Sequence, residues 1–152
     1  MSLVKTALLG LTTLLLVVLA NGQEYAPVDE NCLGCLCEAS TKCVNPGYCP
    51  NGYCGVFLIS HAYWLDTDKL VRPGDSNARQ GAFEDCANDL ACAANIIRNY
   101  MGKHAQDCNG DGVITCTDYV KIHKLGRNAC FGPLTGEFGA LYESCRSKLG
   151  LI

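Results

Sequence analysis

The twelve residues at 107–118, Asp-Cys-Asn-Gly-Asp-Gly-Val-Ile-Thr-Cys-Thr-Asp, space oxygen-bearing side chains in the manner of a calcium-binding loop. A loop of the EF-hand type takes ligands from positions 1, 3, 5, 7, 9 and 12 and has glycine at position 6 for a sharp turn. Gly112 holds position 6 here, and the six ligand positions are Asp107, Asn109, Asp111, Val113, Thr115 and Asp118. The spacing predicts a structural Ca2+ site to which Val113 contributes its backbone carbonyl.

Two features of this loop leave another interpretation open. Position 12 is Asp118, whereas most EF-hand loops have a bidentate glutamate there; dockerin calcium loops, which this one resembles, do use aspartate. Cys108 and Cys116 occupy positions 2 and 10, where disulfides would order the loop. Aspartate and asparagine are also frequent in ordinary turns. A disulfide-bonded polar turn that holds no metal is therefore the alternative.

The twelve cysteines all follow residue 31. An even and dense cysteine set in a secreted chain predicts a disulfide framework, here of six bridges. The alternative is a zinc site, but Cys32 and Cys35 form the sole CxxC pair and the sequence contains no HxxxH. Since an oxidised cysteine cannot also bind a metal as thiolate, we expect disulfides.

The first 22 residues have the pattern of a secretory signal peptide. Lys5 precedes an apolar run at 7–20, and small residues around Ala20 suit cleavage. A membrane anchor is the alternative, but the run is shorter than the roughly 20 residues that a spanning helix needs. The sequence thus predicts a signal at 1–22, a single mature domain at 23–152 and an extracellular location.

Charge and hydropathy argue against two classes of partner, nucleic acid and the membrane. The formal net charge is −3 at pH 7, and no basic patch or basic helix occurs. Proteins that bind nucleic acid neutralise phosphates with clustered lysine and arginine, so nucleic acid is not an expected partner. No long apolar segment follows the signal, so the mature chain is not expected in a membrane either.

Hydrophobic periodicity predicts an α+β domain that is mainly α, with a small β element. A helix is expected after Asp29, which suits an N-cap, and a short strand at 55–59. The other predicted helices lie at 61–65, 81–105, 118–125 and 138–149, the longest of them carrying an apolar stripe at spacings of three and four residues.

Four segments together resemble the invertebrate-type, destabilase-like lysozymes. They are Cys-Leu-Gly-Cys-Leu-Cys-Glu-Ala-Ser-Thr-Lys-Cys at 32–43, Cys-Gly-Val-Phe-Leu-Ile-Ser-His-Ala-Tyr-Trp-Leu-Asp at 54–66, Cys-Ala-Ala-Asn-Ile-Ile-Arg-Asn-Tyr-Met at 92–101 and Asp-Tyr-Val-Lys-Ile-His at 118–123. The sequences at 109–112 and 122–126 look most like the insect branch. The resemblance implies a disulfide-rich, lysozyme-like domain with the bridges Cys37–Cys43, Cys49–Cys54, Cys86–Cys92, Cys108–Cys130, Cys32–Cys116 and Cys35–Cys145.

The resemblance also implies hydrolysis of the β-1,4 bonds between N-acetylmuramic acid and N-acetylglucosamine in peptidoglycan, without a catalytic cofactor. Glycoside hydrolysis of this kind uses a protonated general acid and a second carboxylate. The family position of the acid is Ser40, and the segment that holds the second acid, between Cys49 and Cys54, has no carboxylate. Glu38 and Asp66 are weak substitutes, and two residues along a helix turn Glu38 by about 200° from the required face. Weak or absent muramidase activity is therefore expected.

Two other functions fit the same residues. A non-catalytic, immune-related pseudo-lysozyme would still bind peptidoglycan or another glycan, with Tyr63 and Trp64 stacking on sugar rings. Large aromatic residues are more often buried, so a core position is the competing interpretation for this pair. An isopeptidase would use a serine and a base, and the candidates are Ser40 and Ser60 with Lys42, His61 or His123. No GxSxG motif supports that alternative.

Overall fold

The computed structural model describes residues 28–151, so the predicted signal peptide and the first residues of the mature chain lie outside the described part. The elements are α1 (Glu30–Thr41), the 3-10 turn η1 (Pro50–Gly52), β1 (Tyr53–Cys54), β2 (Ile59–Ser60), α2 (His61–Leu65), α3 (Ala82–Asn88), α4 (Leu90–His104), α5 (Cys116–Leu125), η2 (Arg127–Ala129) and α6 (Gly136–Leu149). The expectation of a mainly helical α+β domain is confirmed.

Helix α1 begins where the sequence predicts. The Asp29 carboxylate accepts a hydrogen bond from the Cys32 amide at 2.7 Å, which satisfies one free N–H of the first turn. The helix ends at Thr41, and the backbone of its C-cap residue, Lys42, is left-handed with φ 55°. Leu33 and Leu36 are buried in the core. Because the helix stops at Thr41, Ser40 stands in its last turn, close to the loop that follows.

The β element differs from the predicted single strand at 55–59. Instead β1 and β2 pair antiparallel, with Tyr53 opposite Ser60 and Cys54 opposite Ile59, and residues 55–58 form the turn between them. Gly55 has φ 69°, and a Cβ at this position would lie 1.8 Å from the Ala87 carbonyl oxygen. The hydrophobic run at 55–59 predicts a strand, but Gly55 at its start forms part of a turn packed against α3.

The predicted helix at 81–105 is two helices. Asp89 ends α3 and begins α4, with an extended backbone at φ −86° and ψ 123°. Its carboxylate accepts from the Cys92 amide at 2.8 Å, so it is the N-cap of α4. The bridge Cys86–Cys92 spans the break. The apolar stripe continues through both helices, which is why periodicity alone did not show the interruption.

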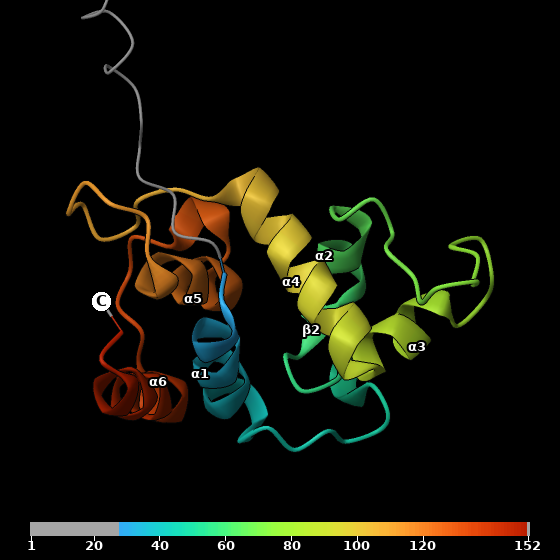
Figure 1. The fold of residues 1–152 in the computed structure, drawn as a ribbon, viewed down its shortest axis with the longest axis horizontal. Helices are drawn as coiled ribbons and strands as arrows, with labels where there is room; N and C mark the ends of the chain where they lie inside the picture. The colour runs from blue at the N-terminus through green and yellow to red at the C-terminus, as the bar shows by residue number, and fades with distance from the viewer. Residues whose placement is uncertain (1–27, 152) are drawn as a thin grey trace, which may run out of the picture.

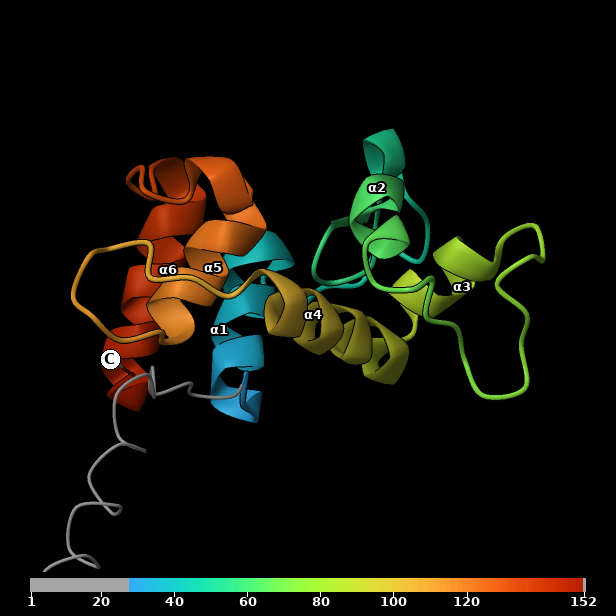
Figure 2. The same cartoon turned by 90° about the horizontal axis from the view of Figure 1, so that it is seen from above.

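The helices form two groups joined by α4. In Figures 1 and 2, α1, α5 and α6 lie together on one side, α2 and α3 lie on the other, and α4 runs between them. The closest helix packing is between α1 and α6. Side chains from both groups and from α4 meet in one buried core, which includes Leu36, Phe57, Ile97, Val120 and Tyr142.

Six disulfides tie these elements together. They are Cys32–Cys116, Cys35–Cys145, Cys37–Cys43, Cys49–Cys54, Cys86–Cys92 and Cys108–Cys130, the pairs that the family resemblance implies. Three of them join distant parts of the chain, and two of these three start from α1. Within residues 28–151, no helix has the length and apolar character needed to cross a membrane.

Candidate functional site

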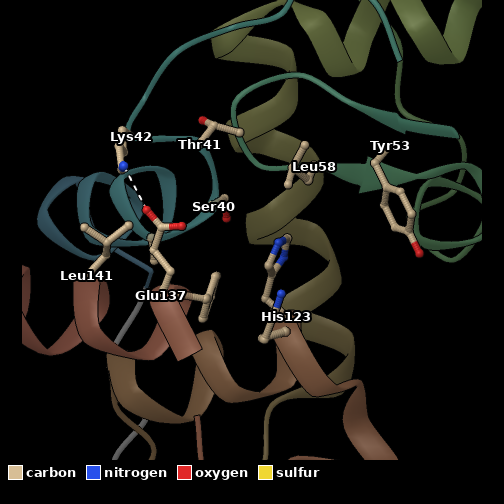
Figure 3. Close-up of a pocket in the computed structure, with 11 residues that line it drawn as sticks. Ser40, Thr41, Lys42, Tyr53, Leu58, His123, Glu137 and Leu141 are labelled. Carbon is tan, nitrogen blue, oxygen red and sulfur yellow. Dashed lines mark ion pairs between the residues drawn. The ribbon is translucent and has the colours of Figure 1, made fainter. Parts of the chain in front are cut away.

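A pocket of about 610 Å³ opens where α1, the β hairpin, α5 and α6 meet. In Figure 3 the Lys42–Glu137 ion pair lies at one edge of this pocket and Tyr53 at the other. The last turn and C-cap of α1 provide one wall, the hairpin a second, and α5 and α6 the rest. The residues that line it are Ala39, Ser40, Thr41, Lys42, Tyr53, Leu58, His123, Lys124, Glu137, Phe138 and Leu141.

Ser40, which the resemblance places at the position of the catalytic acid, does line this pocket. Its Oγ is buried and has no hydrogen-bond partner among the described residues. A serine hydroxyl does not ionise near neutral pH, so it cannot protonate a leaving group as a carboxylic acid does. At the position that the resemblance gives to the acid, the pocket therefore has a side chain without the chemistry of an acid.

One carboxylate among the described residues lines the pocket, and sequence analysis did not find it. Glu137 stands in the first turn of α6 and pairs with Lys42 at 2.8 Å. The hydrogen bond and charge of Lys42 lower the pKa of Glu137 from its ordinary value. A general acid needs the opposite shift, so that it carries a proton near neutral pH. No sequence motif predicts that Glu137 belongs to this site. It shares the pocket wall with Ser40 only because α6 packs against α1.

The predicted substitute acids lie elsewhere. Glu38 lines a separate hollow with Gly34 and Ser144. Asp66 follows α2 outside the pocket, and its backbone carbonyl accepts from Lys103 Nζ at 3.0 Å. Neither side chain reaches the pocket wall. The described pocket residues thus do not supply the two facing carboxylates that glycoside hydrolysis uses.

His123 also lines the pocket and is held neutral. Its Nε2 lies 2.8 Å from the Phe57 carbonyl oxygen, which can only accept, so Nε2 carries the proton of the neutral ring. Burial lowers the pKa of His123 to about 4 against the opposing effect of this hydrogen bond, and the charge of Lys124 lowers it further. The ring is therefore uncharged at neutral pH.

The serine–base pair that an isopeptidase needs is not formed. Ser40 and His123 line the same pocket, but neither Ser40 Oγ nor His123 Nδ1 has a hydrogen-bond partner in the described structure. A nucleophilic serine requires a base within hydrogen-bonding reach. Ser60 Oγ instead accepts from the Tyr63 amide at 3.2 Å as the N-cap of α2.

Of the two predicted sugar platforms, Trp64 is buried in the core and Tyr63 is partly buried against it. Trp64 is 4% exposed, and its Nε1 donates to the Leu70 carbonyl at 2.6 Å. Tyr63 stacks on Tyr100 with ring centroids 3.7 Å apart, and burial raises its pKa well above the usual value. Neither ring lies in the pocket wall, and the burial of Trp64 favours the competing interpretation of a core position, so the stacking role of the pair stays a prediction.

The aromatic residue that does line the pocket is Tyr53. It stands on β1, remains 50% exposed, and lies across the pocket from the Lys42–Glu137 pair in Figure 3. Its strand is only two residues long, which gave sequence periodicity nothing to detect. A half-exposed tyrosine with an apolar face and a polar tip is well suited to contact a sugar ring.

A sequence model of the family described as Destabilase matches residues 29–145. The chain belongs to the destabilase family. The matched region contains the whole α1 helix, the hairpin, α5 and the Glu137 side of the pocket. The recognition of an invertebrate-type lysozyme from sequence is thus confirmed, and its assignment to the insect branch stays a prediction.

Curated relatives of this destabilase-family chain are lysozymes. A lysozyme of Magallana gigas is 34% identical over 115 residues, a match that covers 72% of this chain and 74% of the relative. An invertebrate-type lysozyme of Ruditapes philippinarum is 26% identical over 133 residues, with 84% and 90% covered. Both matches extend over most of each protein, so this chain is similar to whole lysozymes rather than to a fragment.

Solved structures show the same fold. The Meretrix lusoria lysozyme in complex with Aeromonas hydrophila PliI superposes with a TM-score of 0.56 at 25% identity, covering 80% of this chain and 92% of that one. The Tapes japonica lysozyme has a TM-score of 0.56 at 21% identity, with the same coverage. The destabilase chain therefore has the lysozyme-like fold that the resemblance implies.

In the predicted calcium loop, at 107–118, the aspartate side chains accept hydrogen bonds from backbone amides. Asp107 accepts from the amides of Gly110 at 2.7 Å and Gly112 at 2.9 Å, and these backbone hydrogen bonds lower its pKa. Asp118 is fully buried and accepts from the amides of Cys108 and Thr115, both at 2.8 Å. Asp118 thus completes a capping box with Thr115 at the start of α5.

This arrangement does not fit the expected metal site. Calcium takes roughly six to eight oxygens that converge on one point. The residues from 28 to 151 contain no group of three or more His, Cys, Asp or Glu side chains that could hold a metal ion. Asp107 and Asp111 satisfy amides within the loop, while Asp118 bonds to the helix start. The hydrogen bonds of the loop therefore favour the alternative interpretation of a disulfide-bonded polar turn, and the calcium site stays a prediction.

Replacing Asp118 tests which of the two interpretations holds. Asp118→Asn puts an amide donor against buried backbone donors, and a hydrogen bond to a charged group contributes roughly 1.5–3 kcal/mol. We expect a loss of about 2 kcal/mol in the free energy of unfolding, measured by urea titration. The exposed control, Asp111→Asn, should lose less than about 1 kcal/mol. If millimolar calcium raised the wild-type midpoint and Asp111→Asn removed that rise, the loop would be a calcium site after all.

Proposed function

We propose that this chain is a secreted, peptidoglycan-directed member of the invertebrate-type lysozyme family that binds glycan in the Ser40 pocket with weak or no muramidase activity. The observation that carries the proposal is Ser40 itself. It stands in the pocket wall at the family position of the acid, and the one lining carboxylate among the described residues is tied to Lys42. Lysozyme relatives and the six disulfides support an extracellular location.

The pocket retains what binding requires. Ligand sites are concave, mostly apolar hollows of roughly 300–1,000 Å³ with a few polar groups, and this one has about 610 Å³. Phe138 and Leu141 supply apolar surface from α6, while Tyr53 supplies an accessible aromatic ring from β1. A glycan presents the matching combination of apolar ring faces and hydroxyl edges.

The pocket lacks what hydrolysis requires. General acid catalysis contributes typically about 10²–10⁴-fold in rate, and a serine at the acid position forfeits that factor. Glu137 keeps a lowered pKa beside Lys42 and so remains ionised at neutral pH. The hairpin side, where the second acid is expected, contributes Tyr53 and Leu58 and no carboxylate to the wall. Even if the pocket had a protonated general acid, it would therefore lack the second carboxylate that hydrolysis uses.

The first experiment measures binding to insoluble peptidoglycan and the release of new reducing ends by the disulfide-bonded protein. We expect binding without release, and we expect Ser40→Glu to bind without restoring release, because the second carboxylate is still missing. Tyr53→Ala should weaken binding about five- to tenfold through the loss of ring contact. Tyr48→Ala is the matched control, since Tyr48 is 65% exposed and outside the pocket.

Other outcomes would redirect the assignment. Reducing ends released by the native protein would show that a carboxylate other than the family acid, either Glu137 in the wall or one outside it, acts as the acid. Turnover of an ε-(γ-Glu)-Lys substrate, abolished in Ser40→Ala, would favour the isopeptidase alternative. Equal binding by wild type, Tyr53→Ala and Tyr48→Ala would place the glycan site away from this pocket.

A further inference from the structure

The pocket has an unusual charge for this chain. The full sequence carries a net charge of −3, yet the ionised residues in the pocket wall are two lysines, Lys42 and Lys124, and one glutamate, Glu137. His123 adds no charge at neutral pH, because burial holds its pKa near 4. A lysozyme-like pocket that has lost its acids is thus left with an excess of positive charge.

The positive charge of one of the two lysines is balanced by an ion pair. Lys42 Nζ lies 2.8 Å from Glu137 Oε1, and Figure 3 shows this pair on the α1–α6 side of the pocket. The charge and hydrogen bond of Glu137 raise the pKa of Lys42, and Glu38 acts on it in the same direction. Glu38 lines the separate hollow beside Ser144, so its charge acts on Lys42 without its side chain entering this wall.

The second lysine has no such partner. Lys124 stands near the end of α5, and its Nζ lies 4.8 Å from the centre of the Phe138 ring in the same pocket wall. Within residues 28–151 no acidic side chain forms an ion pair with it. A cation over an aromatic face keeps its full charge, so the ammonium group is held at the pocket and is free to meet an anion.

We propose that the pocket selects glycans that carry a carboxylate, and that Lys124 is the residue that recognises it. The proposal rests on the proposed glycan-binding function and names the class of glycan. The ammonium group of Lys124 has no acidic partner among the described residues, so it can pair with one carboxylate of a bound sugar. Complementary charge in a binding site discriminates between ligands of similar shape, and the two catalytic acids of a muramidase would repel this group.

Two hexasaccharides of equal length test the proposal. One alternates glucuronic acid with N-acetylglucosamine, and the other contains N-acetylglucosamine alone. We expect the acidic hexasaccharide to bind at least threefold more tightly by calorimetry at about 50 mM salt, and the preference to fade at about 500 mM salt because exposed charges are then screened. The net negative charge of the whole protein predicts the opposite preference, so a preference for the acidic ligand points to a local site.

Three charge-removing variants locate that site. Lys124→Gln should abolish the preference for the acidic hexasaccharide, because the affinities for the two hexasaccharides then become equal within twofold. Glu137→Gln should strengthen binding of the acidic hexasaccharide about threefold, because Lys42 loses its partner. Lys148→Gln on α6 is the matched control, since Lys148 lies in the hollow with Glu38 and should change neither ligand.

The results separate failure of the inference from failure of the proposed function. Equal affinity for both hexasaccharides, or a preference that survives in Lys124→Gln, would overturn the inference and leave glycan binding intact. An unchanged affinity of Glu137→Gln for the acidic ligand would also count against it. If neither hexasaccharide nor peptidoglycan bound, the proposed function itself would fail.

Discussion

Removal of the Cys35–Cys145 bridge, by Cys35→Ala with Cys145→Ala, is expected to lower the free energy of unfolding by about 5 kcal/mol. The bridge closes a loop with a sequence separation of 110 residues, and in the chain-entropy description a loop of that length restricts the unfolded chain by about this amount. Alanine is chosen because Cys35 is fully buried, where a serine hydroxyl would add its own cost. Guanidinium unfolding monitored by Trp64 fluorescence gives the value.

The matched control for this variant is on the same helix. Cys37–Cys43 also starts from α1 but closes a separation of only 6 residues, so Cys37→Ala with Cys43→Ala should lose about 2 kcal/mol. Equal losses in the two double variants would show that loop length does not determine the contribution of these bridges. A further consequence concerns the pocket, because Cys35–Cys145 joins α1 to α6, which provide two of its walls. Glycan binding should therefore weaken in the first variant and persist in the second.

The parts of this fold that sequence predicts are those set by local chemistry and by cysteine pattern. Asp29 precedes α1 as an N-cap, and its carboxylate bonds to the helix as expected. The short helix at 61–65 is found with those bounds. The six pairs implied by the family resemblance are the six that the structure contains. In each case the structure is determined by a few neighbouring residues or is implied by a cysteine spacing shared with a family.

The site was harder to predict because its residues meet only through tertiary packing. Glu137 reaches the Ser40 wall because α6 packs on α1, and Tyr53 reaches it from a two-residue strand. Trp64 has the composition of a sugar platform, but its Nε1 finds a carbonyl partner inside the protein. Asp118 fits a calcium loop by spacing, yet it satisfies backbone amides at the start of α5. Residue spacing in the sequence does not show whether a polar side chain binds a ligand or a backbone group of the protein itself.

His123 should make the protein less stable in mildly acidic solution. Its pKa lies near 4 in the folded protein against an ordinary value of 6.5, so the folded state favours the neutral ring. Between these two pH values the unfolded chain binds one more proton than the folded chain. The resulting stability is fully present above pH 6.5 and is lost as the pH falls toward 4. A difference of this size corresponds to about 3 kcal/mol.

This loss can be separated from the titration of acids by its pH range and by one variant. Carboxylates whose pKa is lowered in the fold, such as Asp107 and Glu137, weaken the protein mainly below about pH 4.5. Urea unfolding at intervals from pH 7.5 to 4.5 should show a slope near 1.4 kcal/mol per pH unit at the acidic end. His123→Gln, whose amide can still donate to the Phe57 carbonyl, should flatten that slope, and His61→Gln on the exposed start of α2 should not. A slope unchanged in His123→Gln would mean that the acid sensitivity arises elsewhere, and that the pocket histidine takes up its proton without cost to the fold.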